Sequence, residues 1–235
     1  NYYLNAVPGS AVSIEVQDAA GKAIRDYSNE ATRPVRAEEL AAPSDDESGP
    51  VRRAAPPVRL TANAGMNRLT WDFNDADGIM VAPGPYKVKV TIGSWTHTEP
   101  LTLKNDPRLV ADGVTTADLR EQYDHNVKAR EMANEVGRVA NRVRQARTRL
   151  RSGGNADSLA KVEALADSLF GPDEGIRYGR PGMQTQITYL AGMTGRVDQR
   201  VGQDAIERFA FLRKELSAFE VLVNRTLGPE HPLIP

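Results

Sequence analysis

The chain has 235 residues, of which 40% are hydrophobic, and its 30 basic and 31 acidic side chains leave a formal net charge of −1. A charge this close to zero excludes a chain-wide field that attracts nucleic acid or an anionic membrane surface, and the length is sufficient for two domains. The absence of cysteine excludes a disulfide framework and a thiolate metal site, and no apolar run reaches the roughly 18 residues of a membrane-spanning helix.

The first residues, NYYLNAVPGS, contain neither an initiating methionine nor a charged-then-apolar leader, so we interpret the chain as a processed or excised piece of a longer protein. From there to about residue 106, hydrophobic residues alternate with polar ones, which is the pattern of half-buried strands. Val12, Ile14 and Val16 alternate on the first predicted strand. Residues 18–21 are predicted to turn, and residues 23–27 to return as the partner strand.

Residues 28–57 interrupt this pattern with a stretch rich in proline and acidic residues, including APSDDESGP. Composition alone indicates a linker. Because proline lowers the conformational cost of ordering, we expect this Pro-rich arm to lie ordered against its own domain or against a neighbouring chain.

Strands are predicted to resume after the arm. Leu69, Trp71 and Phe73 alternate on one strand, residues 86–92 alternate on the next, and residues 95–103 follow a turn at IGSW. Several short antiparallel strands with Gly and Pro between them predict an immunoglobulin-like (Ig-like) antiparallel β-sandwich over residues 1–108.

An acidic stretch, DFNDADG, lies between two of these strands. Hard cations prefer clustered oxygen ligands, so its oxygen-bearing side chains are candidate metal ligands: Asp72, Asn74, Asp75 and Asp77. The spacing departs from a calcium loop, because Ala76 occupies the fifth position and no glutamate closes the loop. Asn, Asp and Gly also favour tight turns, so a turn is the preferred interpretation, and no metal or other cofactor is predicted.

From Thr115 the hydrophobic period changes to 3.6. Thr115 is a predicted N-cap with Asp118 in the first turn, and the helix should run for about 34 residues to RSGGN. Apolar stripes predict three more helices, over residues 159–169, 187–201 and 209–227. Four amphipathic helices with short connections predict an up-down bundle over residues 109–235, and thus an α+β chain of two segregated parts.

Six arginines between residues 138 and 151 flank both sides of the first helix's apolar stripe, where they can meet acidic neighbours such as Glu163 and Glu220. No aromatic residue interleaves them, so nucleic acid is not a predicted partner. The histidines His97, His125 and His231 match no catalytic or metal motif and are interpreted as packing or surface residues.

The loop over residues 171–182, GPDEGIRYGRPG, is either an ordinary solvent loop or a contact surface. Since interfaces favour Tyr and Arg, the contact candidates within it are Arg177, Tyr178 and Arg180. Trp95 is a further interaction candidate, and carbohydrate is the alternative ligand for Trp95 or Tyr178.

Three sequence blocks carry a resemblance to a known family. They are NRLTWDF from Asn67, APGPYKVKV from Ala82 and EPLTLKNDPR from Glu99. Together they resemble the C-terminal region of bacterial sortilin-like, BNR-repeat β-propeller proteins, which are exported and labelled glycosyl-hydrolase-like or sialidase-like. The stretch VSIEVQDAAGKAIR from Val12 also resembles the Ig-like domain of flagellar hook-capping proteins.

The resemblance implies an exported parent protein, periplasmic or extracellular, and carries over no catalytic residue because the matching blocks are structural. No Asp-box repeat of the propeller occurs in this chain. The sequence therefore favours a non-catalytic structural or interaction module that docks on a protein partner or on the propeller of its own parent chain. The alternative is the accessory domain of a carbohydrate-active enzyme whose active site lies in the missing propeller.

Overall fold

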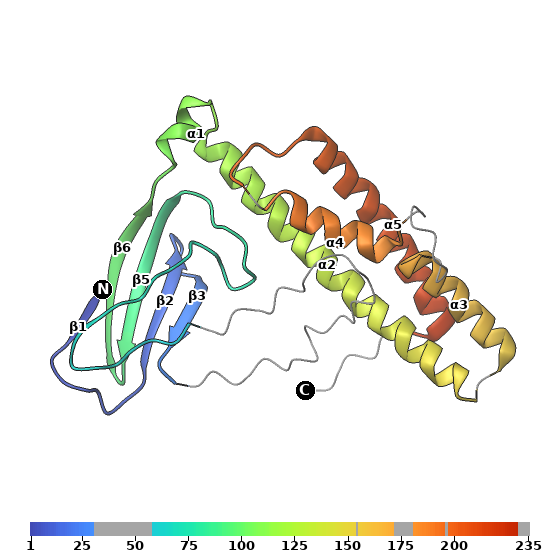
Figure 1. Cartoon of the computed structure of the whole chain (residues 1–235), viewed down its shortest axis with the longest axis horizontal. Coiled ribbons are helices and arrows are strands. Elements are labelled where there is room, and N and C mark those ends of the chain that lie inside the picture. The colour runs from blue at the N-terminus through green and yellow to red at the C-terminus, as the bar shows by residue number, and fades with distance from the viewer. Residues whose placement is uncertain (31–57, 154, 172–180, 196, 230–235) are drawn as a thin grey trace. The chain divides into compact units, whose positions relative to one another are not determined.

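The structure is a computed structural model that describes residues 1–30, 58–153, 155–171, 181–195 and 197–229. These residues form six strands and five helices, which makes the chain mixed α+β with antiparallel sheets, as predicted (Figure 1). The chain divides into two units, Asn1–Lys104 and Asn105–Pro235, whereas the sequence placed the boundary at residue 108. The predicted Pro-rich arm lies outside the described residues except for residues 28–30.

The main sheet of the strand unit has four antiparallel strands in the order β3-β2-β5-β6. Its strands are β2 (Val12–Asp18), β3 (Ala23–Ser28), β5 (Gly84–Ile92) and β6 (Trp95–Leu103). All four were predicted. Gly93, with φ 57°, supplies the positive φ at the first position of the tight β5–β6 turn, where glycine carries no steric penalty.

A second, two-stranded sheet pairs β1 (Tyr2–Leu4) with β4 (Gly65–Asn67). Neither strand was predicted, because three residues are too few to show a period. Asn67 explains why the chain turns before β4: its side-chain amide donates to the backbone oxygens of Asn63 and Gly65, at 2.8 and 3.1 Å, and is buried.

The core of the strand unit lies on one face of the main sheet. Its buried members are Val12, Ile14, Val16, Tyr27 and Leu60. Leu69 and Trp71 pack against them from the segment between β4 and β5. Side chains on the opposite face, such as Glu15 and Lys89, are half-exposed and form an ion pair at 3.4 Å. This division into an apolar and a polar face is the source of the period of two.

The strand predicted at Leu69, Trp71 and Phe73 is wrong, since residues 68–73 form no regular strand. Phe73 has φ 60° and is 46% exposed, so the chain already turns there. Asp72 accepts from the backbone N–H of Asn74, and the Trp71 indole donates to the Asn74 carbonyl at 2.8 Å. These local bonds compete with a sheet ladder for the same backbone groups.

The helical unit contains α1 (Pro107–Ala111), α2 (Thr116–Arg151), α3 (Ala156–Phe170), α4 (Met183–Met193) and α5 (Gln203–Leu227). The long helix α2 begins as predicted: Thr115 and Asp118 form a capping box, each side chain bonding the other's backbone N–H. Burial in the unit's core follows the predicted stripes, including Val136, Val143, Leu169 and Leu216. The short helix α1 was not predicted.

The order of the helices differs from the predicted up-down bundle. Arg151 pairs with Glu163 of α3, and Arg144 contacts Phe170 at the end of α3 and Gln184 at the start of α4. Gln122, near the start of α2, bonds Thr194 at the end of α4. Thus α3 and α4 run in the same direction, one after the other, along successive stretches of α2. Helix α5 runs parallel to α2, since it pairs Arg213 with Glu135 and Asn224 with Arg142.

Candidate functional sites

The acidic stretch at residues 72–78 is a turn in the structure. Asn74 and Met80 form a β-bridge, and the Asp75 carboxylate accepts from the backbone N–H groups of Asp77 and Ile79, at 3.0 and 2.9 Å. Asp72 is likewise engaged by Asn74. Burial is the largest single influence on the pKa of Asp72 and raises it. The hydrogen bonds with Asn74 and the charge of Arg25 together outweigh burial, so the pKa of Asp72 is lowered. These carboxylates therefore order the turn, and within the described residues no group of three or more acidic or histidine side chains is placed to hold a metal.

An exposed row of side chains lies on the edge strand β6. Trp95, which is 54% exposed, stacks on His97 with ring centroids 5.9 Å apart, and Nε2 of His97 lies 2.6 Å from the Glu99 carboxylate. In the β5–β6 register these three residues face Ile92, Val90 and Val88 respectively. We call Trp95, His97 and Glu99 the β6 row. Paired residues share a face, so the β6 row continues the core face of the sheet into solvent.

A buried polar cluster, which the sequence analysis missed, joins α2 to the end of α4. Nε2 of Gln122 donates to the carbonyls of Thr194 and Val197, at 2.6 and 2.7 Å, and its side-chain oxygen accepts from the Gln199 backbone at 3.3 Å. The Thr194 hydroxyl donates to Asn126 at 2.5 Å. The sequence does contain a signal for this cluster: Gln122 and Asn126, three and seven residues after Leu119, place polar side chains in the apolar stripe of α2.

His125 lies beside this cluster, edge-on to Phe209 at 5.6 Å, and among the described residues its buried Nε2 has no hydrogen-bond partner. Burial lowers the pKa of His125 below its ordinary 6.5, and the charge of Lys128 lowers it further, while Glu121 acts in the opposite direction. The buried ring is thus held neutral because the charged imidazolium would lose water without gaining a partner.

A pH dependence of stability follows from His125. The unfolded chain binds the proton more readily, so the stability is complete above about pH 6.5 and falls as the pH drops through the lower folded-state pKa. We expect wild type to lose more unfolding free energy than His125→Gln between about pH 7.5 and about pH 5.5. Denaturant titrations of both proteins measure this difference. Burial also raises the pKa of Glu220, but Glu220 is present in both proteins, so its contribution to the pH dependence cancels. Equal losses would contradict it.

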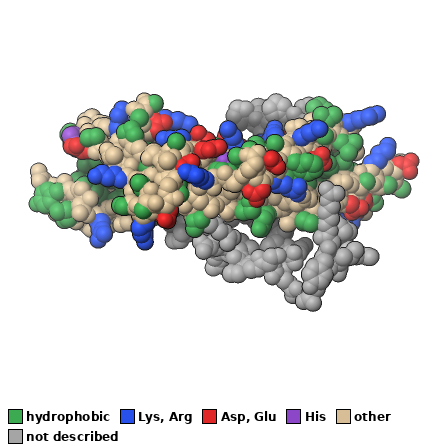
Figure 2. Space-filling model, turned by 90° about the horizontal axis from the view of Figure 1, so that it is seen from above, with side chains coloured by type: hydrophobic (Ala, Val, Ile, Leu, Met, Phe, Trp, Pro, Cys, Tyr) green, Lys and Arg blue, Asp and Glu red, His purple; other side chains and the backbone are tan. Residues whose placement is uncertain are grey.

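Two of the six arginines on α2 partner an acidic side chain in the way that their flanking positions predicted. Arg147 and Arg151 both reach Glu163, at 2.7 and 2.8 Å. On the other side Arg213 of α5 binds both oxygens of Glu135 and lowers its pKa. In the view of Figure 2, Lys and Arg side chains alternate with Asp and Glu side chains without a continuous patch of one sign. That face has no basic stripe of the kind that grips a phosphate backbone.

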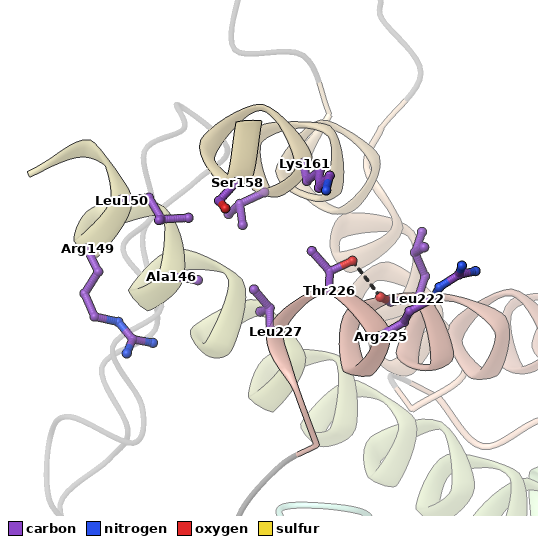
Figure 3. Close-up of a pocket in the computed structure, with 10 residues that line it drawn as sticks. Ala146, Arg149, Leu150, Ser158, Lys161, Leu222, Arg225, Thr226 and Leu227 are labelled. Atoms are coloured by element: carbon purple, nitrogen blue, oxygen red, sulfur yellow. Dashed lines mark hydrogen bonds between the residues drawn. The ribbon is translucent and has the colours of Figure 1, made fainter. Parts of the chain in front are cut away.

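A pocket of about 770 Å³ lies between the C-terminal end of α2, the start of α3 and the end of α5. We call it the α2/α3/α5 pocket. Leu150 and Leu227 point toward each other across it (Figure 3). The same figure shows the guanidinium groups of Arg149 and Arg225 at its outer edges. Sequence reasoning missed this pocket because its walls come from three helices that are distant in the chain.

The remaining sequence candidates lie elsewhere. Arg177, Tyr178 and Arg180 fall outside the described residues, as does His231. Along the part of the chain that the structure describes, no helix has both the length and the apolar character needed to cross a bilayer. Comparisons with protein-family models, curated proteins and solved structures found no match to this chain.

Proposed function

We propose that this chain is a non-catalytic interaction module of a larger exported protein, and that its strand unit docks through β6 onto an extended segment of a partner protein. The observation that carries the proposal is the β6 row. Among the described residues, a half-exposed tryptophan stands on the core face of the main sheet at its edge strand β6. Exposed aromatic side chains beside an open sheet edge favour protein contacts.

The backbone of β6 supports the same mode of binding. Among the described strands β6 pairs only with β5, so the other edge of its nine residues offers unpaired N–H and C=O groups. An added strand can bond these groups while its alternate side chains contact the β6 row. Pro100 lacks an N–H and limits the number of positions at which a strand can add, which is a usual protection of exposed edges.

The Ig-like character of the strand unit belongs to this proposal. In Ig-like sandwiches strand B pairs with E in one sheet, while C′, C, F and G lie side by side in the other. The β1-β4 pair and the order β3-β2-β5-β6 follow this scheme in chain order. In addition, the buried Tyr86 hydroxyl donates to the Ala82 carbonyl at 2.5 Å, an upstream bond like that of the tyrosine corner. In this scheme β6 is strand G, at a sheet edge.

The test places a photo-crosslinking amino acid at residue 97 or at residue 98 of the full chain. His97 lies on the core face and Thr98 on the polar face, so the pair differs only in the face presented. We expect the reagent at 97, and not at 98, to label one defined protein in an extract of the source organism. The labelled protein is then purified, and it is either a separate chain or the propeller of the parent.

Binding of the purified partner is measured with Trp95→Ser and with Tyr189→Ser, which removes a 71% exposed aromatic from the helical unit. Loss of a central interface tryptophan should weaken binding at least about 30-fold, whereas the control should bind like wild type. A partner that binds Trp95→Ser unchanged, equal labelling from both faces, or no labelled protein from residue 97 would each overturn the proposal.

The second candidate function is carbohydrate binding by an accessory domain of a carbohydrate-active enzyme. The favouring observation is the exposed Trp95 ring, stacked within 16° of parallel on His97, with the Glu99 carboxylate beside it as an acceptor. A flat apolar ring next to polar groups suits the apolar face and hydroxyls of a sugar. Titration of the full chain with an oligosaccharide panel separates this candidate from protein docking, because only a carbohydrate site gives a binding signal without a partner protein. Trp95→Ser should abolish that signal.

A further inference from the structure

The α2/α3/α5 pocket has an apolar floor. Its apolar lining residues are Ala146, Leu150, Val162, Leu222 and Leu227, and Ser158 and Thr226 also line it. Ala146 and Val162 are buried, whereas Leu222 is 48% exposed. A volume of about 770 Å³ lies within the range of small-molecule sites.

The charges around this pocket have one sign. Among the described residues, Arg149, Lys161 and Arg225 line it, and no acidic side chain does. Within the described residues none of the three forms an ion pair, in contrast to the neighbouring Arg147 and Arg151, which share Glu163. A second hollow, between α4 and α5, is lined by both Asp204 and Arg208, so it favours neither sign. The α2/α3/α5 pocket therefore favours anions, and the hollow between α4 and α5 does not.

We propose that the α2/α3/α5 pocket binds a single-chain amphipathic anion, an acyl chain that carries a carboxylate or phosphate head. The chain lies between Leu150 and Leu227, over Val162. The head stays at the rim, where the exposed side chains of Arg149 and Arg225, at opposite edges in Figure 3, and the ammonium of Lys161 supply positive charge. This inference concerns the helical unit and does not rest on docking through β6.

The first experiment titrates the full chain by calorimetry with saturated carboxylates of eight, ten and twelve carbons, each below its micelle concentration. Each added methylene that enters the pocket should tighten binding about fourfold. Dodecyl phosphate tests the other head, and dodecyltrimethylammonium presents the same tail with the opposite charge. We expect one site per chain for both anions, and binding of the cation at least tenfold weaker.

The second experiment assigns the binding to this pocket. Arg225→Glu reverses a lining charge, and Lys214→Glu makes the same type of change at an exposed position of the same helix outside the pocket. Ser158→Trp, from an exposed lining position, fills the pocket without changing its charge. We expect Arg225→Glu to weaken binding of the twelve-carbon carboxylate about tenfold, Ser158→Trp to abolish it, and Lys214→Glu to leave it within about twofold of wild type.

Circular dichroism of each variant confirms that the helices are intact before titration. An affinity that does not rise with chain length, equal binding of the cationic amphiphile, or unchanged binding by both pocket variants would overturn the inference. None of these results tests the β6 crosslinks, so either proposal can be contradicted while the other stands.

Discussion

Replacing Gln122 with alanine should lower the free energy of unfolding of the helical unit by about 2–4 kcal/mol. The side-chain amide of Gln122 donates to two backbone carbonyls and its oxygen accepts from a third backbone group, all in the segment after α4. Alanine removes these bonds and leaves the buried Thr194 carbonyl with only a long bond from the Asn126 side-chain amide, at 3.4 Å, and a poorly satisfied buried polar group is costly. Denaturant unfolding of the full chain, followed by the helical signal, measures the loss.

The matched control for this change is Gln145→Ala, which removes the same side chain from an exposed position of the same helix. It should change the free energy of unfolding by no more than about 0.5 kcal/mol. If both variants unfold at the same denaturant concentration, the cluster around Gln122 does not hold the end of α4 to α2.

Leu216→Ala is expected to cost about 2–5 kcal/mol, because it removes a fully buried side chain from the core of the helical unit. The lost stability combines the transfer of the missing atoms to water with the cavity that they leave. The same denaturant titration measures it. Helix propensity does not account for the loss, since alanine is the better helix former.

Leu222→Ala is the control for this second prediction. It makes the same substitution on α5, where the side chain is 48% exposed, and should cost less than about 1 kcal/mol. Since Leu222 also lines the α2/α3/α5 pocket, this variant should weaken acyl-chain binding while leaving the fold intact. Similar losses of stability for Leu216→Ala and Leu222→Ala would show that α5 does not bury the face assigned to it.

The two proposed surfaces lie on different units and use different chemistry. The β6 row combines aromatic area with unpaired backbone groups, which suits an extended polypeptide. The α2/α3/α5 pocket combines an apolar floor with three cations, which suits a small amphipathic anion. We thus propose one surface for docking and a separate site for a ligand on the same chain.

Several elements followed from the sequence alone because local physics specifies them. The start of α2 is set by the capping box of Thr115 and Asp118, and its length by a stripe that continues to the glycines after Arg151. The β5–β6 hairpin is set by alternation on both sides of a two-residue turn that begins with Gly93. Caps, turns and hydrophobic periods act over a few residues, so their signals are present in the sequence itself.

The other features depend on residues that only the tertiary structure brings together. The stripe from Ile187 to Val201 predicts a longer α4, yet the helix ends at Met193, and Gln122 and Asn126 of α2 bond the backbone and side chain of Thr194 just after that end. The exposure of Trp95 depends on which strands cover the sheet, and the α2/α3/α5 pocket on the spacing of three helices. Hydrogen bonds and contacts between segments some 70 residues apart leave no periodic signal in the sequence, so the sites that they form become visible only in the folded chain.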